Sequence, residues 1–568
     1  MKKYFLYLVA LLILAGCSGK RGSNDAKSIE GRDIVADSGM VVSAHPQSSA
    51  IGVKILQKGG NAIDAAVATE FALAVCYPEA GNIGGGGFML IRTYDGKTDI
   101  IDFREEAPSL ATRDMYLDIK GNVTEGASTD THLASGVPGT VDGMILAHSR
   151  YGKLPFRDVV QPAIELAEKG FPVTKEQAAS LNSNRTMFIE RNSARTAFVR
   201  DSLWKEGDIL IQFDLAETLK RIRDYGRDGF YGGKTARLII KEMHRGNGII
   251  NENDLKEYKS ASRNSISVDY KGYKVITIPP PSGGGIMLIQ LLQMIEPYPV
   301  RDWGFHSTQV IHLMVEAERR AFADRSEYLG DPEFMKSPFC KLIDKKYIIH
   351  RMTTFDPKRA SQSLTIKPGS PEGYSSEETT HFSVVDADGN AVSVTTTLNN
   401  TFGNSIVVDS AGFILNNEMD DFSVKPGFPN MYGMVGGEIN SVQPGKRMLS
   451  SMTPTIVEKN GRLSLVVGSP GGSTIPTSVF QVLVNVIDFD MSIQEAVDKG
   501  RFHHQWLPDY ISYEKNAIDS ITVCKLNEMG HKLKSRSSIG RVNAIQILPD
   551  GRKSGGADKR SYNSSCGY

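Results

Sequence analysis

The sequence is poor in cysteine and has no excess of charge of either sign. Its 5 cysteines in 568 residues show neither a Cys-x-x-Cys pair nor the spacing of a zinc site. Lys plus Arg total 65 and Asp plus Glu total 65, which argues against nucleic acid or another polyanion as the main partner. Beyond the N-terminus no apolar run reaches about 18 residues, so we expect no transmembrane helix.

The N-terminus is similar to a bacterial lipoprotein signal. Two lysines precede an apolar run over residues 4–15, which is shorter than the roughly 20 residues that span a bilayer. The run ends in Leu14-Ala15-Gly16-Cys17, small residues followed by a cysteine. We expect residues 1–16 to be removed, Cys17 to carry lipid, and residues 17–38 to form a polar tether. A plain signal peptide with a chance cysteine is the alternative.

The remaining chain divides into a helix-rich part and a strand-rich part. Residues 357–378 lack periodicity and are typical of an exposed linker. Strand-like runs dominate from Thr379 to about Val467. This division favours a layered α+β fold in which helices cover sheets. The segments with helical periodicity are residues 43–77 with a break at Gly59-Gly60-Asn61, 161–170, 213–225, 286–295, 308–328 and 477–487.

A threonine-rich hairpin begins the strand-rich part. Two runs of β-branched residues flank a turn at residues 386–390 that contains Asp-Gly. If Val385 pairs with Ala391, the same register places Thr379 directly opposite Thr397. Directly opposed side chains have Cβ atoms about 4.5–5.5 Å apart, close enough for one hydroxyl to orient the other. A one-residue slip would break this pairing.

Thr379 becomes a candidate nucleophile only if the chain is cut immediately before it. An internal threonine hydroxyl is a poor nucleophile, and no base is evident nearby. A threonine at a new N-terminus carries its own base, the α-amine, whose pKa of roughly 7.7–8.0 suits proton transfer near neutrality. An ordinary threonine-rich edge hairpin is the alternative interpretation.

Three polar clusters are candidates for substrate binding. Residues 415–422 carry three carboxylates within four positions, which is typical of a solvated turn or of a site for an ammonium group. Ser450 and Ser451 precede a strand, where they cap a turn or bind a carboxylate. Arg104 at a strand end is the natural bidentate partner of a carboxylate, with a surface salt bridge as the alternative.

The glycine-rich runs match nucleotide-binding loops poorly. Gly84–Gly87 precedes a strand, the reverse of the dinucleotide fingerprint, and residues 283–285 lack the Gly-Lys-Ser/Thr ending. Residues 468–473 run from strand to helix and are a candidate for presenting backbone N–H groups to an oxyanion, although a packing turn is the simpler interpretation. Adjacent His503 and His504 point to different sides of a strand, so we expect no metal site there.

Together these segments resemble the γ-glutamyltransferase (glutathione hydrolase) family of N-terminal-nucleophile hydrolases. The resemblance extends from about Gly39 to the C-terminus. It depends on six motifs in order, which are Gly84-Gly85-Gly86-Gly87-Phe88, Asp102-Phe103-Arg104-Glu105, Thr379-Thr380-His381-Phe382-Ser383, Leu415-Asn416-Asn417-Glu418-Met419-Asp420-Asp421-Phe422, Leu449-Ser450-Ser451-Met452 and Gly468-Ser469-Pro470-Gly471-Gly472.

The resemblance implies a four-layer αββα sandwich and autocatalytic cleavage between Glu378 and Thr379. The products would be a large subunit, with its body at residues 39–378, and a small subunit of residues 379–568 that stay together. Thr379 would take the γ-glutamyl group of glutathione and related compounds as an ester. Water, or the amine of an amino acid or peptide, would accept that group. No metal and no organic cofactor is implied.

The resemblance also implies roles for the remaining site residues. Gly471 and Gly472 match the oxyanion hole, and Thr397 matches the residue that orients the nucleophile. The positions that hold the substrate α-carboxylate are matched by Arg104, Ser450 and Ser451. Those around its α-amine are matched by Asn399, Glu418 and Asp421. The loop of residues 429–437, with Tyr432, is similar to a lid over the pocket.

Two alternatives remain open on the sequence alone. A cephalosporin acylase would share the fold and the maturation but take a different acyl group, and Arg104 with the serine pair favours a glutamyl substrate. A lipoprotein that binds peptides or amino acids would never expose Thr379 as a terminus. In each case we expect an exported, lipid-anchored protein, located at the periplasmic face of a bacterial envelope.

Overall fold

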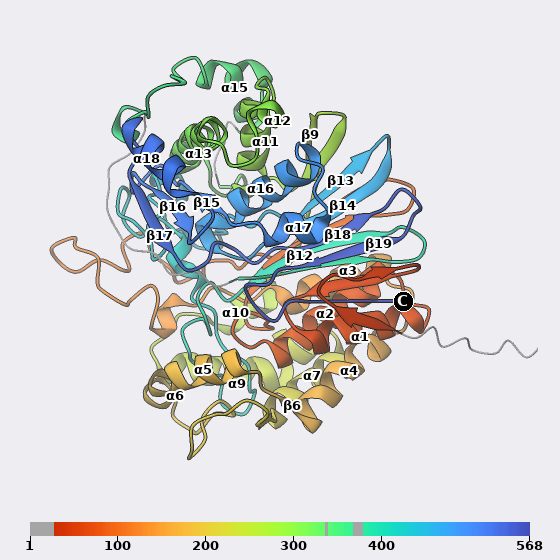
Figure 1. The fold of residues 1–568 in the computed structure, drawn as a ribbon. Coiled ribbons are helices and arrows are strands. Elements are labelled where there is room, and N and C mark those ends of the chain that lie inside the picture. Colours follow the sequence, from red (N-terminus) through yellow and green to blue (C-terminus); the bar gives the residue numbers. More distant parts are fainter. Residues whose placement is uncertain (1–27, 335–338, 367–378) are drawn as a thin grey trace, which may run out of the picture.

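Two antiparallel β-sheets lie face to face, and helices cover both outer faces (Figure 1). The computed structural model describes residues 28–334, 339–366 and 379–568. This arrangement confirms the predicted αββα sandwich. Within the described ranges, no helix is both long and apolar enough to cross a membrane.

The first sheet carries the threonine hairpin at its centre. Strands from both sides of the predicted cleavage point alternate across it, so the two pieces would share one sheet after cleavage. In spatial order the strands are β1 (Ile29–Gly31), β20 (Ser564–Gly567), β3 (Met40–Ser43), β11 (Thr380–Val385), β12 (Ala391–Thr397), β4 (Gly86–Arg92), β5 (Thr98–Asp102) and β8 (Ala261–Arg263).

The second sheet packs against the inner face of the first. Its spatial order is β2 (Val35–Ala36), β19 (Lys553–Ala557), β18 (Asn543–Ile547), β14 (Arg462–Gly468), β13 (Thr455–Lys459), β10 (Tyr273–Thr277) and β9 (Ile266–Tyr270). Two small sheets lie outside this body. They consist of β15 (Phe502–His503), β16 (Ile511–Glu514) and β17 (Leu533–Arg536), and of β6 (Phe171–Pro172) and β7 (Ile209–Leu210).

The helices form the two outer layers (Figure 1). On the side of the first sheet are α1 (Pro46–Gln57), α2 (Ala62–Cys76), α3 (Thr140–Tyr151), α4 (Phe156–Lys169), α5 (Lys175–Ser183), α6 (Arg185–Arg191), α7 (Phe213–Tyr225), α8 (Asp228–Tyr231), α9 (Gly233–Arg245) and α10 (Glu252–Glu257). On the side of the second sheet are α11 (Gly284–Ile295), α12 (Val300–Trp303), α13 (Thr308–Tyr328), α14 (Phe339–Leu342), α15 (Lys345–Arg351), α16 (Ile475–Ile487), α17 (Ile493–Asp498) and α18 (Ser520–Glu528).

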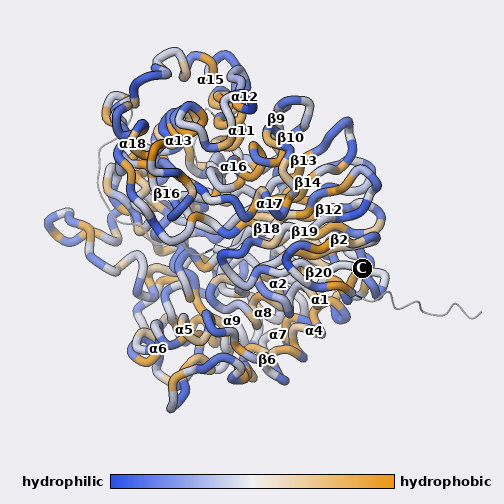
Figure 2. The backbone as a smooth tube through the Cα atoms, in the orientation of Figure 1, coloured by the Kyte–Doolittle hydropathy of each residue, from blue (hydrophilic) through white to orange (hydrophobic). Residues whose placement is uncertain are grey.

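Three apolar cores correspond to the three interfaces between the layers. Alternate side chains of a strand face opposite sides of its sheet. On β11, Phe382 and Val384 therefore pack with the helices of the first layer, whereas Val385 packs between the sheets. Figure 2 shows the hydrophobic segments along the central strands and helices. By this alternation, Thr379 and Thr397 belong to the side of the first sheet that faces the second.

Helix α2 explains why the alanine-rich segment near the N-terminus is so apolar. All its residues are buried, because it lies beneath β11 and β12 and is covered by other helices. Small side chains allow this close packing. Asn61 caps the start of this helix, since its side chain accepts hydrogen bonds from the backbone N–H groups of Ile63 and Asp64 in a capping box. The predicted break at Gly59-Gly60-Asn61 is confirmed.

The prediction of dominant strands from Thr379 to Val467 is wrong in its middle. Between β12 and β13 the described chain consists of loops, isolated bridges and short 3-10 turns, among them Glu418–Asp421 and Glu438–Asn440. Left-handed backbone conformations at Asn399 (φ 76°) and Phe402 (φ 59°) interrupt any extended run. This irregular segment supplies much of the site described below.

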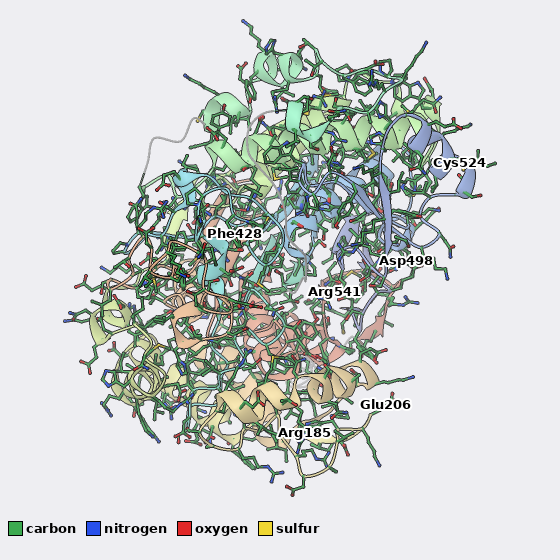
Figure 3. The ribbon with its side chains drawn as sticks, turned by 90° about the vertical axis from the view of Figure 1, so that its left-hand side faces the viewer. Arg185, Glu206, Phe428, Asp498, Cys524 and Arg541 are labelled. Atoms are coloured by element: carbon green, nitrogen blue, oxygen red, sulfur yellow. The ribbon has the colours of Figure 1, made fainter. Side chains whose placement is uncertain are left out.

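All four cysteines of the described ranges have free thiols. Cys76 and Cys566 are buried, and Cys340 and Cys524 are exposed. Cys524 lies on α18 at the periphery of the molecule (Figure 3).

Candidate active site

The threonine pair has the predicted register. Val385 pairs with Ala391, and the same ladder continues to Thr380 opposite Thr396. Thr379 and Thr397 therefore face each other, with their Oγ1 atoms 3.4 Å apart. This separation is longer than an ordinary O–H···O hydrogen bond, so the hydroxyls are in contact without being tightly bound. Both side chains are buried.

The backbone around Thr397 is held by two asparagines. The backbone N–H of Asn399 donates to Thr397 Oγ1 at 2.7 Å, and Asn82 Nδ2 donates to the Thr397 carbonyl at 2.9 Å. Asn82 Oδ1 in turn accepts from the N–H of Gly85 at 2.9 Å. The sequence analysis did not single out Asn82. Its only signal was its place just before the Gly84–Gly87 run.

The Gly471-Gly472 turn lies beneath Tyr432. Gly471 has φ 130° and Gly472 has φ 51°, conformations that favour glycine. A Cβ added to Gly472 would lie 2.8 Å from the Tyr432 ring. The Tyr432 hydroxyl is 2.5 Å from both the carbonyl and the side-chain oxygen of Asn399, and Gln505 Nε2 donates to the Tyr432 carbonyl at 3.0 Å. The ring thus closes over the glycine turn, and its loop begins beside Phe428 at the surface (Figure 3).

One small cavity, of about 20 Å³, unites most of the predicted site. Arg104 and Gly471 do not line it: Arg104 contacts two lining residues from behind, and Gly471 immediately precedes a third. The residues that line it are Thr379, Thr397, Asn399, Glu418, Asp421, Tyr432, Met434, Ser450, Ser451, Met452, Gly472 and Ile475. Of the three apolar members, Met434 lies in the predicted lid loop and Met452 ends a family motif, whereas Ile475 had no signal that separates it from ordinary core residues.

Arg104 is the centre of a buried ion cluster. Its guanidinium donates to Glu418 Oε1, to Asp421 Oδ2 at 2.5 Å and to the Met448 carbonyl at 3.3 Å. The Arg104 and Glu418 side chains are almost completely inaccessible to solvent. The structure therefore places in direct contact the residues matched to the two opposite charges of the substrate.

Burial makes the carboxylates of this cluster reluctant to ionise. Desolvation raises the pKa of Glu105 to about 7, with Arg104 opposing the shift, and it also raises the pKa of Glu418 and of Asp421. Burial works against the charge of Arg104, yet the three carboxylates together raise the pKa of its guanidinium. The arginine therefore remains charged, while burial disfavours the ionised form of each acid.

Two further residues of the cluster were given no role in the sequence analysis. Both oxygens of Glu105 are buried without a hydrogen-bond partner in the described part of the chain, although Arg104 lies 3.6 Å away. Arg325, near the end of α13, is buried beside Asp421, and desolvation lowers its pKa to about 10. Two arginines thus face three acids, a balance that suits a ligand bearing both an ammonium and a carboxylate.

The serine pair is held at the edge of the second sheet. Ser450 is fixed through its backbone, since its N–H donates to the Pro281 carbonyl and its carbonyl accepts from Gly283, both at 2.9 Å. Ser450 Oγ accepts from the N–H of Met452 at 3.1 Å. A hydroxyl that accepts one hydrogen bond can still donate its own proton, which suits a ligand carboxylate.

Glu70 lies beneath the threonine hairpin on α2. It is completely buried, and both of its oxygens lack a hydrogen-bond partner among the described residues. Desolvation raises its pKa to about 8, against an ordinary value of 4.5. The folded protein therefore keeps a proton that the unfolded chain releases above pH 4.5.

We expect Glu70→Gln to change the pH dependence of stability. As the pH rises from 4.5 to about 8, the free energy of unfolding of the unsubstituted protein should fall relative to that of the variant. The fall should be up to about 1.4 kcal/mol per pH unit. Chemical denaturation of both proteins at pH 5 and at pH 8 measures this. Glu206→Gln, at an exposed carboxyl (Figure 3), controls for the loss of an acidic residue. Parallel pH profiles for Glu70→Gln and the unsubstituted protein would contradict the assignment.

Among the residues that the structure describes, one buried cluster has ligand atoms close enough together for a metal ion. It consists of His312, Glu316 and His531. His312 Nδ1 lies 2.7 Å from His531 Nε2, and Glu316 forms ion pairs with Arg319 and Arg320. Two guanidinium groups on the only carboxylate of the cluster disfavour a cation, so we interpret it as a structural polar network.

Two predicted positions lie outside the described residues. They are Glu378, on the amino side of the predicted cleavage point, and Cys17, the predicted lipidation site.

The family model described as Gamma-glutamyltranspeptidase matches residues 48–568. A model of the prokaryotic membrane lipoprotein lipid attachment site matches residues 1–18, which supports an exported protein anchored to a membrane by lipid. The glutathione hydrolase proenzyme of Escherichia coli (strain K12) is 48% identical over 536 residues, covering 94% of this chain and 92% of the relative.

Solved structures of two related kinds of enzyme share this fold. The γ-glutamyltranspeptidase of Helicobacter pylori is 45% identical with a TM-score of 0.57, covering 58% of this chain and 94% of that one. A cephalosporin acylase from Bacillus halodurans has a TM-score of 0.82 at 26% identity, covering 95% and 97%. Since the family model spans most of the sequence and the threonine hairpin has the expected register, the chain belongs to the γ-glutamyltranspeptidase family of N-terminal-nucleophile hydrolases.

Proposed function

We propose that this protein cleaves itself before Thr379 and then transfers γ-glutamyl groups from glutathione and related compounds. The observation that carries the proposal is the opposed pair Thr379 and Thr397, which lines one cavity with Glu418 and Asp421 of the buried ion cluster. In this pair Thr379 is the nucleophile and Thr397 supplies the orienting hydroxyl. The ion cluster fits the zwitterionic end of an unblocked γ-glutamyl group.

Maturation begins with Thr379 as an internal residue. Its Oγ1 attacks the carbonyl of Glu378, and the peptide bond is replaced by an ester as the Thr379 nitrogen leaves with a proton. Water then hydrolyses the ester, giving a carboxylate on Glu378 and a free amine on Thr379. The two pieces remain associated because their strands alternate in the first sheet.

Turnover uses the amine that maturation releases. Thr379 Oγ1 attacks the γ-carbonyl carbon while its hydroxyl proton passes to the α-amine, directly or through water. The proton then goes to the leaving amine as the carbon–nitrogen bond breaks, leaving a γ-glutamyl ester on Thr379. Attack by water or by an acceptor amine restores the hydroxyl. The Oγ1 of Thr397 lies close enough to orient the nucleophile.

The substrate is recognised by its paired charges. Arg104 and the hydroxyls of Ser450 and Ser451 bind the α-carboxylate, while Glu418 and Asp421 bind the α-ammonium group. On binding, the substrate carboxylate takes the place of Glu418 and Asp421 beside Arg104, and the substrate ammonium group takes the place of Arg104 beside these two acids. Because the cavity measures only about 20 Å³, binding also requires the loop that carries Tyr432 to move. An analogue lacking either charge leaves buried groups unpaired and is rejected strongly.

We expect Gly472→Ala to lower kcat by about 100-fold to 1,000-fold, the usual cost of losing one oxyanion donor. The added Cβ would meet the Tyr432 ring at 2.8 Å, and the backbone has φ 51°, so the turn must shift. The control is Gly461→Ala, also at positive φ (73°) but with no atom within 4 Å of the new Cβ. Steady-state kinetics with γ-glutamyl-p-nitroanilide measure both variants. Equal losses in the two would refute a role for the glycine turn in the reaction.

The decisive experiment compares cleavage and substrate choice in one preparation. Purified protein should give two bands under denaturing conditions, with the smaller beginning at Thr379. It should release p-nitroaniline from γ-glutamyl-p-nitroanilide and leave a glutaryl-cephalosporin intact. A single full-length band without activity would favour a binding lipoprotein, and preference for the cephalosporin would favour an acylase. We place the enzyme at the periplasmic face of the envelope, with amino acids or peptides as acceptors.

A further inference from the structure

Of the six family motifs, the Gly84–Gly87 run has no role in the reaction proposed above. In the structure it packs between the two halves of the site. A Cβ added to Gly85 would lie 2.0 Å from the Thr397 carbonyl oxygen, and a Cβ added to Gly86 would lie 2.6 Å from a carboxylate oxygen of Glu105. Only glycine permits both approaches. The run thus contacts the strand that carries the orienting hydroxyl on one side and the ion cluster on the other.

Asn82 connects this run to the strand that carries Thr397. Its Oδ1 accepts from the backbone N–H of Gly85 at 2.9 Å. Its Nδ2 donates to the Thr397 carbonyl at 2.9 Å and to Thr396 Oγ1 at 3.1 Å, and it also lies 3.0 Å from the Ala80 carbonyl. Because a carbonyl can only accept and a backbone N–H can only donate, these partners fix the orientation of the amide. The residue is 4% exposed, so water does not readily replace these bonds.

The partners of Asn82 lie on both sides of the predicted cleavage point. Its Oδ1 also accepts, at 2.8 Å, from the hydroxyl of Thr140, the first residue of α3. Gly85 and Thr140 precede Glu378 in the chain, whereas Thr397 follows it. After cleavage, the hydrogen bond from Asn82 to the Thr397 carbonyl would therefore join the two pieces directly behind the threonine pair.

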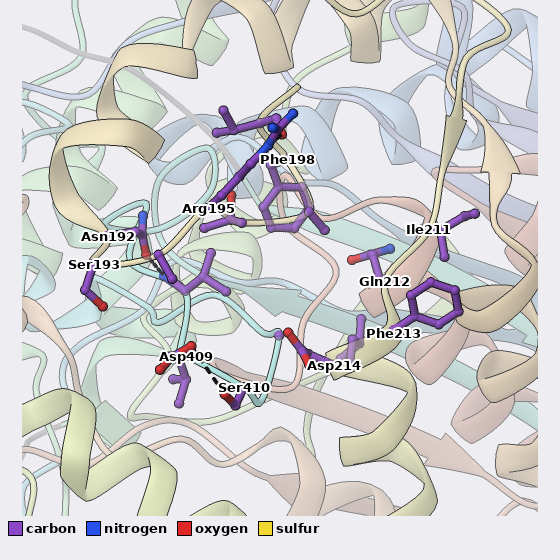
Figure 4. Close-up of a pocket in the computed structure, with 18 residues that line it drawn as sticks. Asn192, Ser193, Arg195, Phe198, Ile211, Gln212, Phe213, Asp214, Asp409 and Ser410 are labelled. Atoms are coloured by element: carbon purple, nitrogen blue, oxygen red, sulfur yellow. Dashed lines mark hydrogen bonds between the residues drawn. The ribbon is translucent and has the colours of Figure 1, made fainter. Parts of the chain in front are cut away.

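The space behind Asn82 leaves the end of β12 room to move. A void of about 10 Å³ is lined by Asn82 and by Leu398, the residue that follows β12. This void shares Phe198 and Gln212 with the larger cavity of about 300 Å³ shown in Figure 4. Since protein interiors are otherwise closely packed, loss of the Asn82 hydrogen bonds would let this end of the strand shift into unfilled space.

We infer that Asn82 is a positioning residue, whose amide holds the Thr397 carbonyl so that the Thr397 hydroxyl lies beside Thr379 Oγ1. The inference rests on the proposed function, and it gives Asn82 no contact with the substrate. A displacement of about 1 Å in reacting groups can lower a rate about 100-fold. Self-cleavage and turnover should both depend on Asn82, whereas KM should not, because the substrate charges are bound by other residues.

Asn82→Asp tests the contact with Thr397 selectively. One carboxylate oxygen can still accept from Gly85 and Thr140, but the other faces the Thr397 carbonyl and repels it instead of donating. At pH 8 we expect the rate of self-cleavage and kcat to fall about 100-fold, with KM for γ-glutamyl-p-nitroanilide unchanged within about threefold. Burial favours the neutral carboxyl, whose O–H can donate to that carbonyl. At pH 5.5 kcat relative to the unsubstituted protein should therefore recover about tenfold, and purification at this pH supplies folded variant.

Asn82→Ala has no donor at any pH, so its kcat should be low without recovery in acid. The matched controls are Asn404→Asp and Asn404→Ala. Asn404 is also fully buried, and its Oδ1 accepts from the Ile406 N–H at 3.1 Å. Its Nδ2 donates to the Thr131 carbonyl and to the Ser135 hydroxyl, both at 3.1 Å. Thermal denaturation should show similar losses of stability at the two positions, whereas the controls should keep their cleavage rate and kcat within about threefold.

Two results would overturn the inference. One is an equal cleavage rate and kcat for the Asn82 and Asn404 variants. The other is a fall in activity that appears in KM as much as in kcat and does not respond to acid, as expected for general loosening of the site. The unsubstituted protein separates these results from failure of the proposed function. If it neither cleaved itself nor released p-nitroaniline, the proposed function would be refuted and the inference with it.

Discussion

Thr379→Ala is expected to give one uncut chain and no measurable γ-glutamyl transfer. The substitution removes the hydroxyl that attacks the preceding carbonyl, so the terminal amine never forms and nucleophile and base are lost together. Loss of a nucleophile lowers kcat by about a million-fold in a well-studied hydrolase, so activity should fall below detection. Denaturing electrophoresis and release of p-nitroaniline measure the two losses separately.

Thr380→Ala is the matched control for this variant. Thr380 is the next residue and is equally buried, but its side chain lies on the side of the sheet that packs against α2. We expect it to be cleaved and active. Thr379→Ser, which keeps a hydroxyl, should retain cleavage and reduced activity. Activity in the Thr379→Ala chain, or an intact Glu378–Thr379 bond in active enzyme, would refute the assigned nucleophile.

Arg104→Gln is expected to reduce both stability and substrate binding. The buried carboxylates of Glu418 and Asp421 would lose their guanidinium, and breaking a buried ion pair from one side costs about 3–5 kcal/mol. The same change removes the proposed partner of the substrate α-carboxylate, so kcat/KM for γ-glutamyl-p-nitroanilide should fall by about 1,000-fold. Thermal denaturation and kinetics measure the two effects.

Arg113→Gln provides the control for loss of an ion-paired arginine. Arg113 pairs with Asp114 and Glu438 and is 37% exposed, so its loss should cost no more than about 1 kcal/mol. Adding Glu418→Gln to Arg104→Gln should recover part of the stability, because one uncompensated charge is removed, without recovering activity. If Arg104→Gln were as stable and active as Arg113→Gln, the ion cluster would have neither proposed role.

Local sequence patterns predicted the regular parts of the fold well. The periodicity of residues 213–225 and 308–328 gave α7 and α13 with their observed bounds, because long amphipathic or apolar helices repeat the same signal over several turns. The stretch between β12 and β13 was predicted poorly. Its β-branched and polar residues are compatible with strands, but left-handed positions such as Asn399 depend on contacts that no local pattern encodes.

The sequence by itself predicted the hairpin register, and with it the meeting of Thr379 and Thr397, because a two-residue side-chain period and a defined turn leave few registers, and the structure confirms that register. Family motifs located the other candidate residues but not their mutual contacts. Only the tertiary structure decided that Arg104 contacts Glu418 and Asp421, which are 314 and 317 positions away along the chain. Such contacts, like the burial that raises the pKa of Glu105 and Glu70, depend on how the layers exclude water, a property of the packed fold that residue spacing does not specify.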